Sequence, residues 1–170
     1  IPIRPDWPIV ELSEVIKLSS GRGLTQSQMK VGPYSVYGGN GQNGLHSEYF
    51  VEDPNIAIGR VGAYCGVVHL TAPKSWITDN ALYVTEYKQK IDRKYLGQAL
   101  VQLGLNQFAK VGGQPSISQT TVYERAIPFP PLAMQQEVAA EIEAEQALVA
   151  ANRDLITRFE KKIQATLARV

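Results

Sequence analysis

The stretch from residue 133 to residue 170, AMQQEVAAEIEAEQALVAANRDLITRFEKKIQATLARV, contains no glycine and no proline. It is rich in alanine, glutamate, glutamine, arginine and lysine, which favour helices. An apolar residue recurs at every seventh position, which predicts a helix with one apolar stripe and a helical partner. The members of this stripe are Ile142, Val149, Ile156, Ile163 and Val170. At 1.5 Å per residue the helix would span roughly 57 Å, so we expect a protruding coiled-coil arm rather than a helix folded back on a domain.

The preceding residues, 1–132, have a different composition and hold all 14 glycines and all 10 prolines of the chain. Short apolar runs between turn signals predict strands at 34–37, 55–59, 65–70 and 80–87. Helical spacing of apolar residues predicts helices at Leu12–Leu18 and Lys94–Phe108. Since strands and helices do not alternate regularly, we expect an α+β domain with a mostly antiparallel sheet over 1–132, followed by the long helix over 133–170.

The overall composition limits the class of protein. The chain has 170 residues, about one domain, and 44% of them are hydrophobic, enough for a core. Its net charge of +1 gives no sign of a nucleic-acid partner, although a local basic face is compatible with that total. The single cysteine, Cys65, permits no internal disulfide, so we expect a reducing compartment and the cytoplasm. We recognise no signal peptide and no apolar run near 18 residues, so no membrane partner is expected.

The glycine-rich stretch 37–44, YGGNGQNG, spells G-x-G-x-x-G but lacks the context of a nucleotide site. A dinucleotide site needs a helix after the glycines and an acidic residue about twenty positions on, and neither is predicted here. A phosphate-binding loop would have lysine after the last glycine, where this chain has Leu45. His46 and His69 lack matched ligands at useful spacing. We therefore predict no catalytic residue, no metal and no cofactor in this chain.

Two glycine-containing loops, 37–44 and 110–121 (KVGGQPSISQTT), offer amide and hydroxyl side chains beside a flexible backbone. Asn and Gln can form paired hydrogen bonds with adenine, Arg can do so with guanine, and Ser or Thr with either, whereas Lys and Arg also hold phosphates. The alternative is that both loops are plain hairpin turns. The candidate DNA-binding residues are Arg22, Lys30, Asn40, Gln42, Asn43, Arg60, Lys110, Gln114, Ser116 and Ser118.

The order of the segments resembles the target recognition domain of type I restriction-modification specificity subunits. The matching stretches are WPIVELSEVIKLSSGRGLT (7–25), YSVYGGNGQNG (34–44), NIAIGRVGAYCGVV (55–68), GGQPSIS (112–118) and IPFPPLAMQQEVAAEIE (127–143). The resemblance implies a non-catalytic module that reads one half of a split sequence in double-stranded DNA. It also implies long helices that pair antiparallel and dock a methyltransferase, which itself binds S-adenosylmethionine.

The chain departs from that family in having one recognition domain and one helix, where a full specificity subunit has two of each. Three explanations remain open: a half-length subunit that dimerises through the helix, a fragment, or the C-terminal recognition domain of a fused methyltransferase or restriction enzyme. The first residue, Ile1, and the ending after residue 151 favour a fragment or the fused form. The alternative function is a non-catalytic interaction scaffold that uses the helix for docking and the domain for a peptide.

Overall fold

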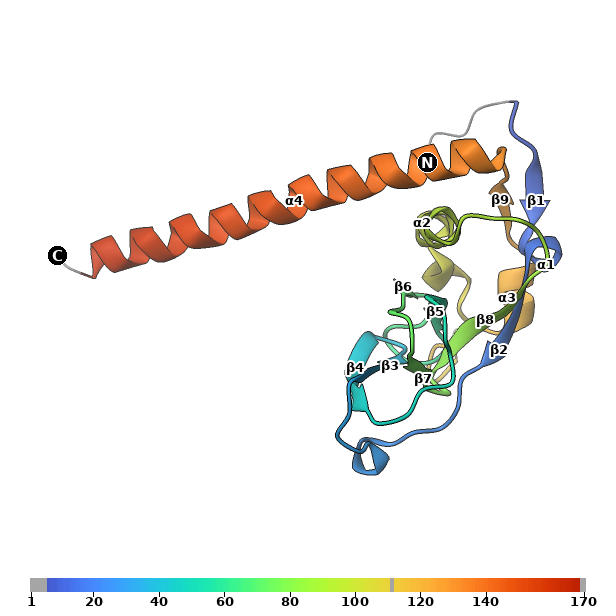
Figure 1. The fold of residues 1–170 in the computed structure, drawn as a ribbon, viewed down its shortest axis with the longest axis horizontal. Helices are drawn as coiled ribbons and strands as arrows, with labels where there is room; N and C mark the ends of the chain where they lie inside the picture. The colour runs from blue at the N-terminus through green and yellow to red at the C-terminus, as the bar shows by residue number, and fades with distance from the viewer. Residues whose placement is uncertain (1–5, 111, 169–170) are drawn as a thin grey trace.

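The computed structural model describes residues 6–110 and 112–168, which form a globular part and one long helix that leaves it (Figure 1). The helices are α1 (Leu12–Val15), α2 (Arg93–Leu103), α3 (Gln119–Tyr123) and α4 (Leu132–Leu167), with 3-10 turns η1 (Gln26–Gln28) and η2 (Leu105–Phe108). The strands are β1 (Ile9–Glu11), β2 (Ile16–Ser20), β3 (Tyr34–Gly38), β4 (Gly41–His46), β5 (Ile56–Gly59), β6 (Val68–Leu70), β7 (Trp76–Ile77), β8 (Ala81–Tyr87) and β9 (Ala126–Pro128).

The strands form three small sheets; β1 and β9 lie beside the start of α4 in Figure 1, and the other two sheets lie farther below it. The central sheet has the order β2-β8-β5-β6 and is antiparallel throughout. β1 pairs antiparallel with β9, which places the start of the domain beside the segment that leads into α4. β4, β3 and β7 form the third sheet, in which β3 runs parallel to β7. The predicted α+β fold with mostly antiparallel sheets is therefore confirmed.

The main core lies between the central sheet, α2 and the first turns of α4. Leu96 and Leu100 of α2 are fully buried and belong to the same apolar cluster as Ile56 and Ile58 of β5. Val138 of α4 joins this cluster, so the start of the long helix is part of the domain core. Removing side chains of this size from water supplies about 1.5–3 kcal/mol each, which is the main force that holds the arm in place.

The second predicted helix, Lys94–Phe108, is correct in place but is interrupted. Asp92 caps the start of α2, because its side chain accepts hydrogen bonds from the backbone N–H groups of Lys94 and Tyr95. Gly104 ends α2 in a left-handed conformation with φ of 58°, and the chain continues as the 3-10 turn η2. The apolar spacing on both sides of Gly104 had suggested one continuous helix.

Two other predicted elements are wrong in extent. The helix expected at Leu12–Leu18 consists only of the four residues of α1, and from Ile16 the chain enters β2. In β2 the side chains of Ile16 and Leu18 are buried and that of Lys17 is exposed, a period of two that belongs to a strand. The strand expected at 65–70 is limited to Val68–Leu70, because Gly66 adopts φ of 82° in the preceding turn.

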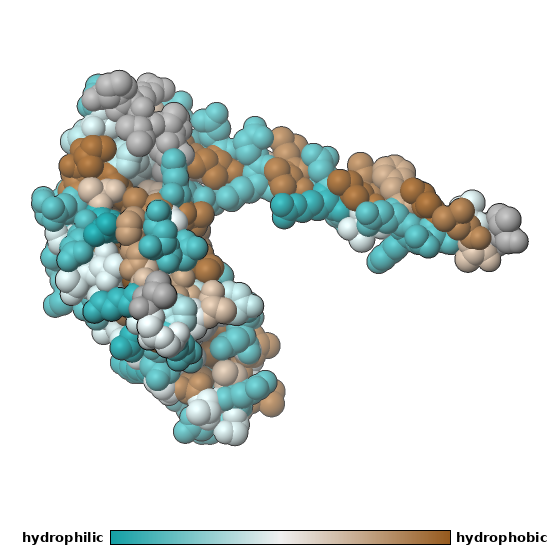
Figure 2. Space-filling model, turned by 180° about the vertical axis from the view of Figure 1, so that it is seen from behind, coloured by the Kyte–Doolittle hydropathy of each residue, from teal (hydrophilic) through white to brown (hydrophobic). Residues whose placement is uncertain are grey.

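The long helix α4 is a protruding arm, as the heptad spacing predicts (Figure 1). Its 36 residues span roughly 54 Å. Gln135, Val138 and Ala139 are buried against the domain, whereas every residue of 144–168 is exposed. Brown apolar patches recur along the arm in Figure 2. Within the described ranges, no helix is both long and apolar enough to cross a membrane.

Candidate nucleic-acid interface

The glycine-rich stretch 37–44 is a β-hairpin, with Gly39 and Asn40 at its tip. β3 and β4 pair up to Gly38 and Gly41. Gly41 has φ of 87°, and a Cβ atom there would meet the His69 ring at 3.0–3.5 Å, so a larger residue does not fit. The hairpin lies at the end of the domain away from α4 (Figure 1).

Three of the predicted DNA-binding residues project from this hairpin: Asn40, Gln42 and Asn43. All three are exposed. Within residues 6–110 and 112–168, none of their side chains takes part in a hydrogen bond or ion pair. Free amides on a rigid turn can bind an external partner without first breaking an internal bond. The stretch is thus a hairpin turn that also presents unengaged polar groups, and the role of these residues in binding DNA stays a prediction.

The loop after β5 lies directly against the tip of the hairpin. A Cβ atom placed on Gly39 would lie 3.6 Å from the Cα atom of Gly59 and 3.2 Å from the carbonyl oxygen of Asn80. The backbone N–H of Arg60 donates to the same Asn80 oxygen at 2.9 Å. These contacts bring the exposed Arg60 and Asn80 beside the tip residue Asn40.

The second glycine loop is tied to the segment that contains Arg60. The backbone N–H of Ile117 donates to the carbonyl of Arg60 at 2.9 Å, and that of Gly62 donates to the carbonyl of Pro115 at 2.9 Å. The N–H of Lys110 donates to the carbonyl of Ser116 at 2.9 Å, which closes the base of the loop. The structure therefore assembles Lys110, Gln114 and Ser116 with Arg60 and the hairpin on one surface, which we call the loop surface.

Beside the hairpin lies a groove of about 610 Å³ with mostly polar lining residues, which we call the polar groove. Its polar side chains come from Thr25, Gln26, Gln28, Asn43, Asp79 and Asn80. Among them, only Asn43 was identified from the sequence. Asp79 and Asn80 belong to the turn between β7 and β8, Gln26–Gln28 form η1, and Thr25 is the N-cap of η1. The dipeptide Asp-Asn between two strand-like runs was an available signal for a polar turn, but nothing in the sequence places it beside Asn43.

The other predicted residues lie at the edge of this region or outside it. Arg22 stacks over the Phe50 ring at 4.3 Å, and Lys30 forms an exposed ion pair with Glu48 at 3.9 Å. Ser118 caps α3, because its hydroxyl accepts a hydrogen bond from the N–H of Thr121 at 3.1 Å. The Ser118 hydroxyl is thus already engaged in capping α3, and its role in binding DNA stays a prediction.

His69 supports the hairpin from beneath. Burial lowers the pKa of His69, and a hydrogen bond with the Gly39 backbone opposes that shift. Its Nε2 atom is buried without a hydrogen-bond partner in the described part of the chain. No group of three or more His, Cys, Asp or Glu side chains among the described residues is arranged to hold a metal ion. The hairpin therefore rests on a neutral ring that fills the space next to Gly41.

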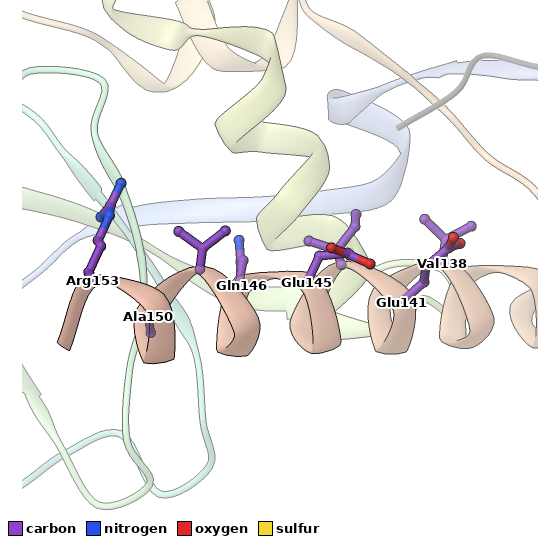
Figure 3. A pocket seen from close by; sticks show the side chains of 8 residues that line it. Val138, Glu141, Glu145, Gln146, Ala150 and Arg153 are labelled. Carbon is purple, nitrogen blue, oxygen red and sulfur yellow. The ribbon is translucent and has the colours of Figure 1, made fainter. Parts of the chain in front are cut away.

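The apolar stripe of α4 is a second exposed surface, which we call the α4 stripe. Ile142 packs on the edge of the core, while Val149, Ile156 and Ile163 are 48%, 56% and 57% exposed. Val170 lies outside the described residues. The first part of the stripe borders a groove of about 640 Å³ along α4, and Figure 3 shows Val138, Glu141, Glu145, Gln146, Ala150 and Arg153 along it. Such a row of half-exposed apolar residues at heptad spacing on a single helix is typical of a surface that packs against a helical partner.

Comparison with known proteins relates most of the chain to one family. A family model described as the type I restriction modification DNA specificity domain matches residues 5–160. The chain is 26% identical over 134 residues to a type I restriction enzyme specificity subunit of Escherichia coli, a match that covers 76% of this chain and 33% of that protein. The chain therefore spans about a third of the length of that curated relative.

Solved structures show the same fold. The S subunit of a type I restriction-modification system from M. genitalium has a TM-score of 0.72 at 17% identity, over 85% of this chain and 40% of that one. A chain from a structure that describes complex assembly and conformational transition of a type I restriction-modification system has a TM-score of 0.71 at 20% identity, over 99% of this chain and 44% of that one. At these identities the likeness concerns the fold, which includes the long helix.

Proposed function

Because the chain belongs to the family of type I restriction modification DNA specificity domains, we propose that it reads a short sequence in double-stranded DNA. The observation that carries this proposal is the loop surface. There, the free amide of Asn40 lies beside the exposed Arg60, and that of Asn43 lines the adjoining polar groove. Each well-placed paired hydrogen bond from such a side chain to a base edge discriminates against a wrong base by about 1–3 kcal/mol.

The cations of this region set the expected strength of phosphate binding. Arg22, Lys30, Arg60 and Lys110 are exposed around the hairpin. If all four neutralise phosphates, the logarithm of the binding constant falls with the logarithm of salt concentration with a slope of about −3.6. This slope corresponds to a loss of affinity of roughly 150-fold between 50 and 200 mM salt. A peptide-binding scaffold has no counterion release of this kind, so the salt dependence distinguishes the two functions.

The α4 stripe is the proposed docking surface for a methyltransferase subunit or fused methyltransferase domain. One structural relative comes from a structure that describes the assembly of a type I restriction-modification system, which supports this partner. A second copy of this chain is the alternative occupant of the stripe. We propose that S-adenosylmethionine and the chemistry belong to the methyltransferase, and that this chain supplies recognition without catalysis.

The direct test is selection from a random pool of duplex DNA by the purified chain together with its methyltransferase subunit or domain, at physiological salt. We expect enrichment of a motif a few base pairs long. The double variant Asn40→Ala with Asn43→Ala should lose that preference and keep its fold. Gln136→Ala, which removes an exposed amide from α4 outside the α4 stripe, is the matched control and should select the same motif as the wild type.

No enrichment by the wild type, with the methyltransferase demonstrably bound, would favour the scaffold function. In that case the glycine-rich hairpin would be a structural turn only. An enriched motif that the double variant selects equally well would keep DNA recognition but remove Asn40 and Asn43 from base reading.

A further inference from the structure

We propose that Asp79 determines part of the base preference by accepting a hydrogen bond from an exocyclic amino group of adenine or cytosine in the polar groove. This inference rests on the proposed function, since it requires that the chain reads duplex DNA. It adds to that function a residue outside both glycine-rich loops, and it names the chemical group that this residue would recognise.

The backbone around Asp79 is fixed on three sides. The N–H of Thr78 donates to the carbonyl of Tyr37 in β3 at 2.8 Å, and the N–H of Ala81 donates to the carbonyl of Thr78 at 3.0 Å. The carbonyl of Asn80 accepts from the N–H of Arg60 at 2.9 Å. A short turn held in this way presents an exposed carboxylate from a rigid support, as precise recognition of a base edge requires.

The two walls of the polar groove differ in how their side chains are engaged. On the η1 side, the Oε1 atom of Gln28 accepts from the backbone N–H and from the hydroxyl of Thr25, each at 2.9 Å. Asn43, Asp79 and Asn80, by contrast, have no side-chain hydrogen bond or ion pair within the described ranges. Thr25 and Gln28 on the η1 side are therefore engaged with each other, whereas the opposite wall presents free polar groups to the space between the two walls.

Asp79 has no cationic partner among the described residues, in contrast to three acids of the segment between β4 and β5. Glu48, Glu52 and Asp53 lie between 3.2 and 3.9 Å from the charged groups of Lys30, Lys74 and Arg93. Asp79 forms no such pair with any residue that the structure describes, although Arg60 is bonded to the neighbouring Asn80. An unpaired carboxylate repels phosphates, so its presence beside the loop surface weakens DNA binding unless it accepts a hydrogen bond from a donor on the DNA.

The identity of that donor follows from the chemistry of the bases. An ionised carboxylate only accepts hydrogen bonds. In the major groove the donors on base edges are the N6 amino group of adenine and the N4 amino group of cytosine, whereas guanine and thymine present oxygen acceptors. Asp79 should therefore favour adenine or cytosine at one position and disfavour guanine and thymine there.

The test repeats the DNA selection with wild type, Asp79→Asn and Glu86→Gln. Glu86 is exposed on β8 and has no side-chain partner in the described part of the chain, so Glu86→Gln makes the same change of charge outside the polar groove. We expect the wild type to require adenine or cytosine at one position. In Asp79→Asn that preference over guanine or thymine should fall by about fivefold or more, since asparagine both donates and accepts. Glu86→Gln should keep the wild-type preference at every position.

A binding measurement with modified DNA then identifies the atom. At the affected position, adenine is replaced by purine, or cytosine by 2-pyrimidinone, each of which lacks the amino group. The wild type should lose affinity for the modified duplex, and Asp79→Ala should bind both duplexes equally. The modified base that lowers the affinity of the wild type shows whether Asp79 contacts adenine or cytosine.

Two outcomes would overturn the inference, and they are distinguishable. A wild type that enriches a motif, with Asp79→Asn selecting the identical motif, would remove Asp79 from recognition and leave the proposed function intact. A wild type that enriches no motif would overturn the proposed function together with this inference.

Discussion

Replacement of Gln135 by methionine should lower the free energy of unfolding by about 3 kcal/mol. Gln135 is fully buried at the start of α4. Its Oε1 accepts from the N–H of Asp92 at 2.9 Å, and its Nε2 donates to the carbonyl of Pro130 at 2.8 Å. Methionine is similar in length but leaves both backbone groups unpaired, at about 1–3 kcal/mol each. Methionine also avoids the cost of burying a polar amide, which offsets part of the cost of the two unpaired backbone groups.

The neighbouring residue provides the matched control. Gln136 is exposed on the same helical turn, so Gln136→Met should change the free energy of unfolding by less than about 0.5 kcal/mol. Urea denaturation followed by circular dichroism measures both variants, and one protein concentration is kept throughout because association through the α4 stripe would shift the apparent stability. Equal stability of Gln135→Met and wild type would refute the argument that these two hydrogen bonds fix the arm to the domain.

Three further predictions concern the core, the hairpin support and the α4 stripe. Tyr95→Phe should cost about 1–2 kcal/mol, because it removes the O–H that donates to the Pro128 carbonyl at 2.8 Å. Burial raises the pKa of Tyr95 to about 12, so the wild type alone should lose stability at this site as pH rises from 10 toward 12 in denaturation titrations. Burial lowers the pKa of His69 from 6.5, so below that pH the unfolded chain binds a proton that the folded chain does not. Melting temperatures should therefore fall less steeply on acidification in His69→Gln than in wild type, and parallel curves would contradict this. Ile156→Glu should weaken association with the methyltransferase or a second copy in sedimentation, whereas Thr157→Glu next to it should weaken it less.

The parts of the fold that could be predicted from the sequence are those whose pattern is local. The heptad spacing indicated α4, and a short apolar run indicated the buried strand β5. At Leu12–Leu18, the spacing of Leu12 and Val15 fits a helix while that of Ile16 and Leu18 fits a strand, and only pairing with β8 decides where one ends. The short strands β1, β7 and β9 have two or three residues each, too few to show a period.

The candidate site could be predicted only in part, because backbone contacts between distant segments assemble it. The amides of 40–43 were identifiable by residue type beside glycines. The polar groove was not, since Asp79 and Thr25 meet Asn43 only after the β7–β8 turn has bonded to β3 and to Arg60. The sequence also could not predict that Gln135 bonds the start of α4 to the domain, because its partner Asp92 lies 43 residues away in sequence.

The division between bonded backbone and free side chains has a physical consequence for how such a surface can change. In the loop surface and the polar groove, backbone hydrogen bonds of Arg60, Asn80 and Ser116 hold the loops together. The side chains of Asn43 and Asp79 form no hydrogen bond or ion pair with the described residues. Exposed substitutions away from structural contacts usually change stability by less than about 0.5 kcal/mol. A change of preferred base at these positions can therefore leave the fold intact. A change at Gln135, by contrast, acts on the fold first and on recognition only through it.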